Sequence, residues 1–185
     1  MCRLARANAR AARTSLRAAL TVHQADMRGF SLPRPVDLIL CNGDALNHLP
    51  RRAELALAAR AAASALRPGG HFFFDVNNWR AFERLWPQTM LLERPGVALL
   101  IQGSNDPRRR RGISESHWFL QQPRAGLWRR HSERLEEICW TPSEIRSTLR
   151  RAGFASVRAF DSARFASPGL TQPGCRTFYL ARLRA

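Results

Sequence analysis

The stretch from Val36 to Val76 restricts the possible folds more than any other part of the chain. Two short and almost continuously apolar segments, 36–41 and 71–76, flank an Ala- and Leu-rich run whose apolar residues recur at helical spacing. Short apolar runs between turn residues are typical of parallel strands buried on both faces. Parallel neighbours need a crossover helix, and Pro68-Gly69-Gly70 predicts where that helix ends. The stretch therefore predicts a βαβ unit with a ligand site outside the carboxyl ends of its strands.

Further elements are expected on the amino-terminal side of this unit. The Arg- and Ala-rich segment 1–20 predicts a surface helix that leads into a strand at 20–25. A transit peptide is the alternative for the same segment, because such peptides are also amphipathic, basic and poor in acidic residues.

The carboxyl-terminal half changes to extended segments and then returns to an αβ pattern. Residues 105–112 give a strong hairpin signal between two apolar runs, so 89–139 predicts an antiparallel unit. Thr141-Pro142 followed by Glu144 predicts a helix that begins with a capping box. Strands are expected after it, at 154–160 and 175–183.

Several short phrases, taken in order, resemble those of class I S-adenosylmethionine-dependent methyltransferases. They are Ala25-Asp26-Met27-Arg28, Asp37-Leu38-Ile39-Leu40-Cys41, Asp44-Ala45-Leu46-Asn47-His48-Leu49, Leu66-Arg67-Pro68-Gly69-Gly70, Trp140-Thr141-Pro142-Ser143-Glu144-Ile145, Ala152-Gly153-Phe154 and Arg176-Thr177-Phe178-Tyr179-Leu180-Ala181-Arg182. The resemblance depends on their order and spacing over almost the whole chain. It implies one Rossmann-like α/β domain, with a core of 1–88 and 140–185 and an antiparallel insertion, 89–139, over the cleft. It also implies methyl transfer from S-adenosylmethionine to a small-molecule acceptor, without a metal.

The glycine-rich loop that holds the methionine end of the cofactor in this family has no counterpart here. No Gly-x-Gly-x-x-Gly pattern occurs in the sequence. In family terms the sheet is N-terminally truncated, so the strand at 20–25 is expected either to pair with 36–41 or to leave an unpaired edge. We expect weak or absent cofactor binding by these 185 residues and impaired methyl transfer, with activity in a longer native form if the start of the chain has been misplaced.

Two segments are expected to hold S-adenosylmethionine. Asp26 and Met27 resemble the family's residues beside the adenine, where a carboxylate accepts from the exocyclic amino group and an apolar side chain covers the ring. The alternative for Asp26 is a turn cap at the end of a strand. Cys41, Asn42 and Gly43 are expected to lie along the cofactor, with Gly43 allowing close approach of the backbone.

The acceptor is expected next to the same loop. Asp44, Asn47, Asn77 and Arg80 are the predicted substrate-binding residues. His48 is the predicted catalytic base, because a neutral imidazole can take the proton of a hydroxyl or amine. The alternative is that Asp44 or Asn47 caps the following helix and that His48 packs beneath it.

The strong positive charge is a weaker guide to function. The formal net charge is +16, every one of the 30 basic residues is Arg, and these residues are spread over nearly every segment. A nucleic-acid footprint clusters on one face, so a compositional bias explains the charge better. A basic nucleic-acid-binding module remains one alternative function. A catalytically inactive remnant or partner-dependent subunit is another.

Cysteine and histidine patterns predict neither a metal site nor a disulfide framework. Cys2, Cys41, Cys139 and Cys175 are scattered without a Cys-x-x-Cys pair, and the five histidines show no His-x-x-x-His spacing. Reduced thiols indicate a cytoplasmic protein. No apolar run approaches the length that spans a membrane.

Overall fold

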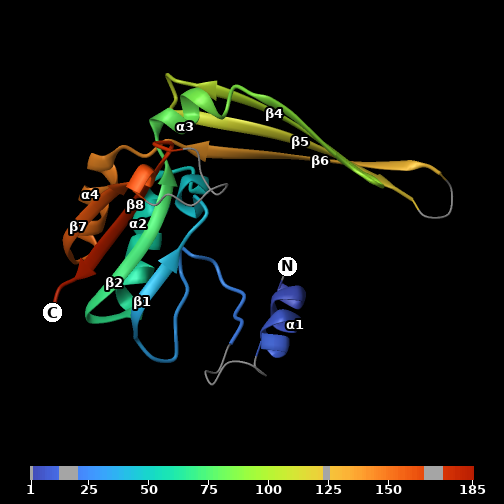
Figure 1. The fold of residues 1–185 in the computed structure, drawn as a ribbon. Coiled ribbons are helices and arrows are strands. Elements are labelled where there is room, and N and C mark those ends of the chain that lie inside the picture. Colours follow the sequence, from blue (N-terminus) through green and yellow to red (C-terminus); the bar gives the residue numbers. More distant parts are fainter. Residues whose placement is uncertain (1, 13–20, 123–125, 165–172) are drawn as a thin grey trace.

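The first of two four-stranded sheets contains the predicted βαβ unit (Figure 1). The computed structural model describes residues 2–12, 21–122, 126–164 and 173–185. The order of the first sheet is β1 (Val36–Cys41), β2 (Leu66–Asn77), β8 (Arg176–Leu183) and β7 (Phe154–Asp161). β1 and β2 are parallel and joined by α2 (Arg52–Ala65), whereas β2–β8 and β8–β7 are antiparallel. The predicted parallel unit is thereby confirmed.

The second sheet is an antiparallel meander formed by the segment that was predicted to be extended. Its strands follow in the order β3 (Thr89–Arg94), β4 (Val97–Asp106), β5 (Arg111–Gln121) and β6 (Trp128–Ile138). The hairpin predicted around residues 105–112 connects β4 to β5. In Figure 1 this sheet lies across one end of the first sheet, and β5 and β6 project far beyond it.

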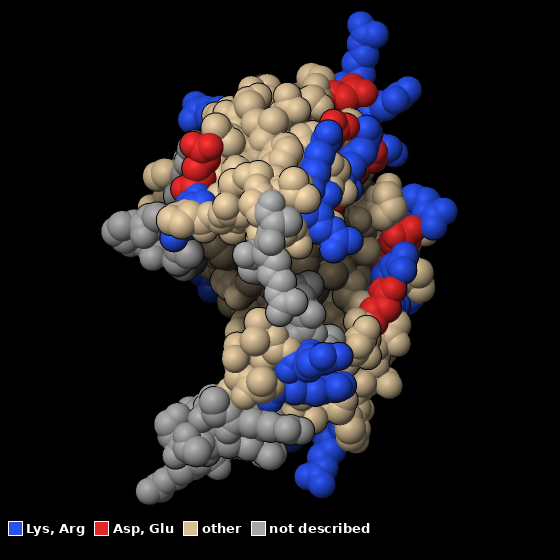
Figure 2. Space-filling model, turned by 90° about the vertical axis from the view of Figure 1, so that its right-hand side faces the viewer, with Lys and Arg blue, Asp and Glu red and all other residues tan. Residues whose placement is uncertain are grey.

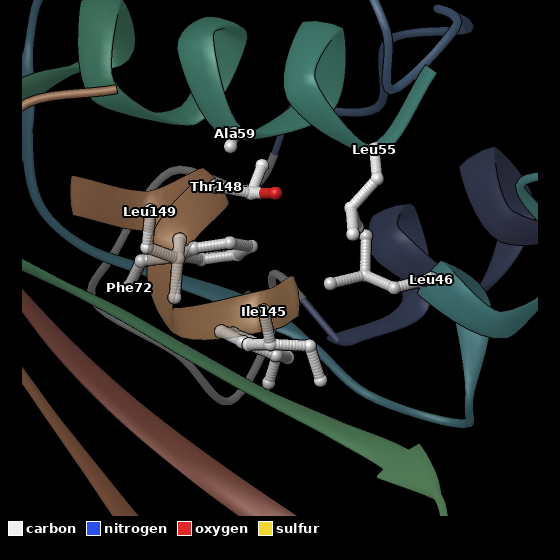
Figure 3. Close-up of a pocket in the computed structure, with 8 residues that line it drawn as sticks. Leu46, Leu55, Ala59, Phe72, Ile145, Thr148 and Leu149 are labelled. Atoms are coloured by element: carbon white, nitrogen blue, oxygen red, sulfur yellow. The ribbon is translucent and has the colours of Figure 1, made fainter. Parts of the chain in front are cut away.

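Two helices cover one face of the first sheet and form the main core with it. They are α2 and α4 (Pro142–Arg151), and the sheet contributes Phe72, Phe74 and Tyr179. Side chains of α2, α4 and β2 surround a small void in this core, among them Leu55, Leu149 and Phe72 (Figure 3). The volume of this void is about 10 Å³. A space of this size holds at most one water molecule, so it is a packing gap in the core.

The start of α4 confirms the predicted capping box. Thr141 accepts a hydrogen bond from the backbone N–H of Glu144, and the Glu144 carboxylate accepts one from the backbone N–H of Thr141. These two bonds satisfy donors that the first turn of a helix leaves without partners.

A smaller apolar cluster joins α3 (Trp79–Arg84) to the second sheet. It contains Phe82, Cys139 and Cys175, with Trp86 packed against them. The Trp86 indole lies directly on Gly112 of β5, where a Cβ atom would be only 1.5 Å from Nε1. Gly112 therefore makes the space in which this indole packs.

The predictions for the amino-terminal region are partly wrong. α1 (Cys2–Ala12) confirms a helix in the first part of 1–20, and 13–20 lie outside the described residues. Residues 21–26 form no strand, so the strand expected at 20–25 is not found in its described part. Within the described residues β1 pairs only with β2, and Leu38 and Leu40 are 50% and 59% exposed.

The end of α2 also differs from the prediction. The helix ends at Ala65, and β2 begins directly at Leu66, so Pro68-Gly69-Gly70 lies inside the strand. Val36 pairs with Leu66 and Leu38 with His71, which makes this stretch an irregularity of the ladder. Pro and Gly are tolerated there because a bulge needs no regular pairing. No helix in the described part of the chain is long and apolar enough to cross a membrane.

Candidate functional site

A cluster of polar side chains lies at the carboxyl ends of β1 and β2. The loop after β1 turns at Gly43 and Asp44, both with positive φ, of 80° and 52°. Their backbone N–H groups donate to Oδ1 and Oδ2 of Asp75 in β2, at 2.8 and 3.2 Å. The buried Asp75 carboxylate therefore fixes the loop against the neighbouring strand.

Asn77, at the end of β2, brings two carboxylates together. Its Nδ2 donates to Oδ2 of Asp44 at 2.7 Å and to Oε2 of Glu137 at 2.9 Å. Glu137 comes from the end of β6, in the second sheet, and is only 4% exposed. The cluster is thus built by both sheets.

Asn47 holds the same region in place through hydrogen bonds to backbone groups. It lies in a short 3-10 helix, 45–48, and is fully buried. Its Nδ2 donates to the carbonyl oxygens of Asn77 and Ile138, at 3.0 and 2.9 Å. Its Oδ1 accepts from the backbone N–H of Asn77 at 3.0 Å. This amide therefore binds backbone, and its predicted contact with an acceptor stays a prediction.

Burial changes the acidity of Glu137. Loss of solvent raises the pKa of its carboxyl to about 8, and the nearby Asp44 charge also raises it. The hydrogen bond from Asn77 and the charge of Arg176 act in the opposite direction. A carboxyl group with such a pKa can both give and take a proton near neutral pH.

His48 stands at the open side of the cluster. Its side chain is 40% exposed, and its Nε2 lies 3.7 Å from Oε1 of Glu137. Its Nδ1 lies 3.3 Å from the carbonyl oxygen of Glu136. The imidazole is therefore accessible on one side and placed beside a buried carboxyl on the other.

Three of the cluster's charged residues were not predicted from the sequence. They are Asp75, Glu137 and Arg176, whose guanidinium pairs with Asp75 and lies 3.6 Å from Asp44. An acidic residue inside the apolar run 71–76 was a usable signal for Asp75. No local pattern marks Glu137 or Arg176, because the antiparallel neighbour and the second sheet bring them here.

The predicted cofactor residues divide between two segments. Asp26 is held by Arg28, with Oδ2 2.6 Å from Nη2, and this hydrogen bond lowers the pKa of Asp26 to about 2. Arg28 also donates to Glu54 in the first turn of α2, and Met27 packs against the main core. A pocket of about 350 Å³ lies beside Asp26, Met27 and residues 30–32.

The loop after β1 supplies the other predicted cofactor residues. Cys41 is half-buried, and burial, with the charge of Asp75, raises the pKa of its thiol to about 11. Asn42 is exposed, and a Cβ at Gly43 would meet no atom within 4 Å. The loop therefore offers a neutral thiol and open backbone to a ligand.

Arg80 is separated from the other predicted substrate residues. Asp44, Asn47, His48 and Asn77 come together, whereas Arg80 lies on α3 and lines a different pocket with Val76. Side chains alternate across a strand, so Val76 and Asn77 point to opposite faces of β2. The roles of all these residues remain predictions.

On the face in Figure 2, arginines form several separate groups with acidic side chains among them.

Known structures share this architecture. The chain superposes on an S-adenosylmethionine-dependent methyltransferase from Clostridium acetobutylicum with a TM-score of 0.75 and 18% identity, over 98% of this chain and 71% of that one. It superposes on the sugar N-methyltransferase KedS8 from Streptoalloteichus with a TM-score of 0.71 and 24% identity, over 96% of this chain and 67% of that one. For DesVI from Streptomyces venezuelae the TM-score is 0.69 and the identity 21%, over 95% of this chain and 69% of that one.

The similarity to known proteins is one of structure, over part of the length of those proteins. No family model matches the sequence, and no curated protein matches it. The chain spans 71% of the Clostridium structure and 63% of CalS10, an amino pentose methyltransferase from Micromonospora echinaspora. The predicted fold class is confirmed: the chain has the Rossmann-like α/β fold of the class I S-adenosylmethionine-dependent methyltransferases.

Proposed function

We propose that this fold serves methyl transfer from S-adenosylmethionine to a small-molecule acceptor beside Asp44, Asn77 and Glu137. The observation that carries the proposal is the polar cluster at the carboxyl ends of β1 and β2, which is where open α/β sheets bind ligands. S-adenosylmethionine, when bound, supplies an electrophilic methyl group on a sulfonium.

The residues present fit part of such a cofactor. The pocket beside Asp26 and Met27 offers a carboxylate and an apolar wall to an adenine. The open backbone at Gly43 and the uncharged Cys41 thiol offer a surface for the rest of the molecule. The sequence contains no Gly-x-Gly-x-x-Gly pattern for the methionine end of the cofactor, so we expect the affinity of these residues for the cofactor to be weak.

An amino group is the acceptor that the cluster favours. Asp44 supplies a carboxylate and Glu137 a buried carboxyl group on either side of one amide, and the negative charge of Asp44 attracts an ammonium group. KedS8 is a sugar N-methyltransferase, which agrees with this choice.

The proton of that ammonium has a defined place to go. Either Glu137 or His48 takes it, and the amine then carries a free electron pair. With the cofactor bound, that pair would accept the methyl group as its bond to sulfur breaks, so that the positive charge of the sulfonium would pass to nitrogen. Because the reaction is an in-line displacement, most of the acceleration comes from alignment.

A titration of the cofactor product S-adenosylhomocysteine into the protein, followed by amide NMR, tests the proposed site. At millimolar ligand we expect shifts at Met27, Asn42 and Gly43 and none in β7. Gly43→Ala should weaken these shifts, because the added methyl group occupies the open backbone and strains a residue with a φ of 80°, whereas Gly29→Ala, which meets no atom within 4 Å, should leave them unchanged. A folded protein without shifts, or with shifts only elsewhere, would refute the site, and micromolar affinity would refute the expected weakness.

A further inference from the structure

We propose a second small-molecule site, for a planar carboxylate such as an aromatic acid, on the opposite face of β2 from the polar cluster. A cavity of about 670 Å³ lies between α3, the start of α4 and the β4–β5 turn. This volume is within the usual range for small-molecule sites, roughly 300–1,000 Å³. Its lining includes three aromatic residues and two arginines, namely Trp79, Arg80, Arg110, Trp140 and Tyr179.

Backbone geometry separates this cavity from the polar cluster. Val76 lines the cavity, and the next residue, Asn77, bonds to Asp44 and Glu137 on the other side of the strand. Trp140 forms part of the wall between the two regions, since its Nε1 donates to the carbonyl oxygen of Leu46 at 2.9 Å. A molecule in the cavity therefore does not reach the Asp44 and Glu137 carboxylates directly.

The aromatic walls are held in fixed positions. Tyr179 stacks on Phe74 with ring centroids 5.1 Å apart and an interplanar angle of 9°. Trp140 is fixed by its hydrogen bond to Leu46. Trp79, in contrast, is 38% exposed at the side of the cavity. Tyr179 and Trp140 are 1% and 5% exposed, so they close the wall of the cavity, and the Trp79 ring is the aromatic surface that a flat, apolar molecule can cover.

Arg80 gives the cavity its preference for an anion. Among the described residues the Arg80 guanidinium has no acidic partner, whereas Arg110 makes a bidentate pair with Glu144 at 2.6 and 3.0 Å. Asp161 also lines the cavity, and its Oδ1 already accepts from the backbone N–H of Ala163 at 2.8 Å. The guanidinium of Arg80 is therefore the cation available to a ligand, and its planar shape matches a carboxylate.

Gly174 provides the place where Arg80 lies. A Cβ at Gly174 would be 3.0 Å from Nη1 of Arg80, and the residue has a φ of 78°. The carbonyl oxygen of Gly174 also accepts from Nδ2 of Asn78, whose Oδ1 in turn accepts from the backbone N–H of Arg80. Arg80 is thus positioned by contacts other than ion pairs.

The experiment uses naphthoate as the probe and naphthamide as its uncharged match, with tryptophan fluorescence and amide NMR as readouts. We expect naphthoate to bind, with amide shifts at Trp79, Arg80 and Thr177. Naphthamide should bind about tenfold more weakly, since it lacks the charge-assisted hydrogen bond. Arg80→Gln should reduce naphthoate affinity by a similar factor, and Trp79→Ala should reduce the affinity for both probes.

Controls separate this site from the proposed methyl-transfer site. Arg84→Gln changes an exposed arginine of the same helix that does not line the cavity, so naphthoate affinity should not change. Equal affinity for the two probes, an unchanged affinity in Arg80→Gln, or shifts centred on Asp44 would overturn the proposal, as would absence of naphthoate binding to the folded protein. S-adenosylhomocysteine binding at Gly43 is measured separately and decides only the proposed function.

Discussion

Asn47 and Asn77 bind each other twice, through Nδ2 of Asn47 to the carbonyl oxygen of Asn77 and through the N–H of Asn77 to Oδ1 of Asn47, both at 3.0 Å. A side-chain amide thus pairs with a backbone amide as a neighbouring strand would. The pair connects the loop after β1 to the end of β2, and its further bond to Ile138 adds β6.

Replacing Asn47 by Ala should therefore destabilise the whole protein. The change leaves buried backbone groups of Asn77 and Ile138 without partners, which costs about 3 kcal/mol of unfolding free energy. Urea denaturation measures the change. Asn42→Ala, in the exposed part of the same loop, should alter stability by less than about 0.5 kcal/mol. Equal effects of the two substitutions would contradict this account.

Glu137 should make stability depend on pH. Its folded pKa is raised from 4.5 to about 8, so the folded state binds a proton more tightly than the unfolded state. The contribution of Glu137 to the unfolding free energy should be complete below pH 4.5 and be lost between pH 4.5 and 8, by at most about 1.4 kcal/mol per pH unit. Glu137→Gln should remove this fall.

The matched control for Glu137 is its neighbour on β6. Glu136 forms exposed ion pairs with Arg111 and Arg134, and Glu136→Gln should keep the decline in stability over the same pH range. Denaturant midpoints recorded across that range show whether the decline depends on Glu137. A wild-type profile that rises from pH 5 to 8, or a decline that persists in Glu137→Gln, would be incompatible with a buried protonated carboxyl.

Gly112→Ala should disrupt the contact between α3 and the second sheet. The new methyl group would lie 1.5 Å from Nε1 of Trp86, so the indole or the strand has to move, at a cost of about 1–3 kcal/mol. Thermal unfolding and near-ultraviolet circular dichroism report both effects. Gly29→Ala, with open space around it, should leave the melting temperature nearly unchanged. A native-like Gly112→Ala would show that the packing of Trp86 is different.

Thr141→Ala should weaken the start of α4. The substitution removes the hydroxyl that accepts from the Glu144 N–H and costs about 1 kcal/mol. Thr141→Ser keeps the hydroxyl and should restore most of that stability. Chemical denaturation distinguishes the two variants, and equal losses would show that the methyl group of Thr141, and not the cap, carries the effect.

The sequence was sufficient where local chemistry decides the structure. Alternation between short apolar runs and a helical face predicted β1, α2 and most of β2, and the Thr141 box predicted α4. It failed for the strand expected at 20–25, because an extended segment becomes a strand only when it pairs with another, and no described strand pairs with its described residues. Pro68-Gly69-Gly70 misplaced the helix end because β2 accommodates these residues as an irregularity.

The candidate site shows the same division. The loop 41–48 and Asn77 could be named because they follow predicted strands directly. Glu137 could not, since its position depends on how a second sheet meets the first. Arg80 was assigned to the same site because the family resemblance makes this segment the next position along the cleft, whereas in the structure Arg80 lies on α3 and lines a different pocket.

Glu137 belongs to the second sheet but forms part of the cluster at the first sheet, and this restricts how the second sheet can be exchanged between related proteins. If the second sheet were exchanged for that of a relative by a crossover after Cys139, Glu137 would be replaced as well, whereas any residue at position 138 still offers a backbone carbonyl to Asn47. A chimaera that keeps the native cluster has to change parent before Glu137. The segment that can be exchanged therefore ends inside β6. A library of such chimaeras can vary the projecting part of β5 and β6 and keep Glu137 and the polar cluster unchanged.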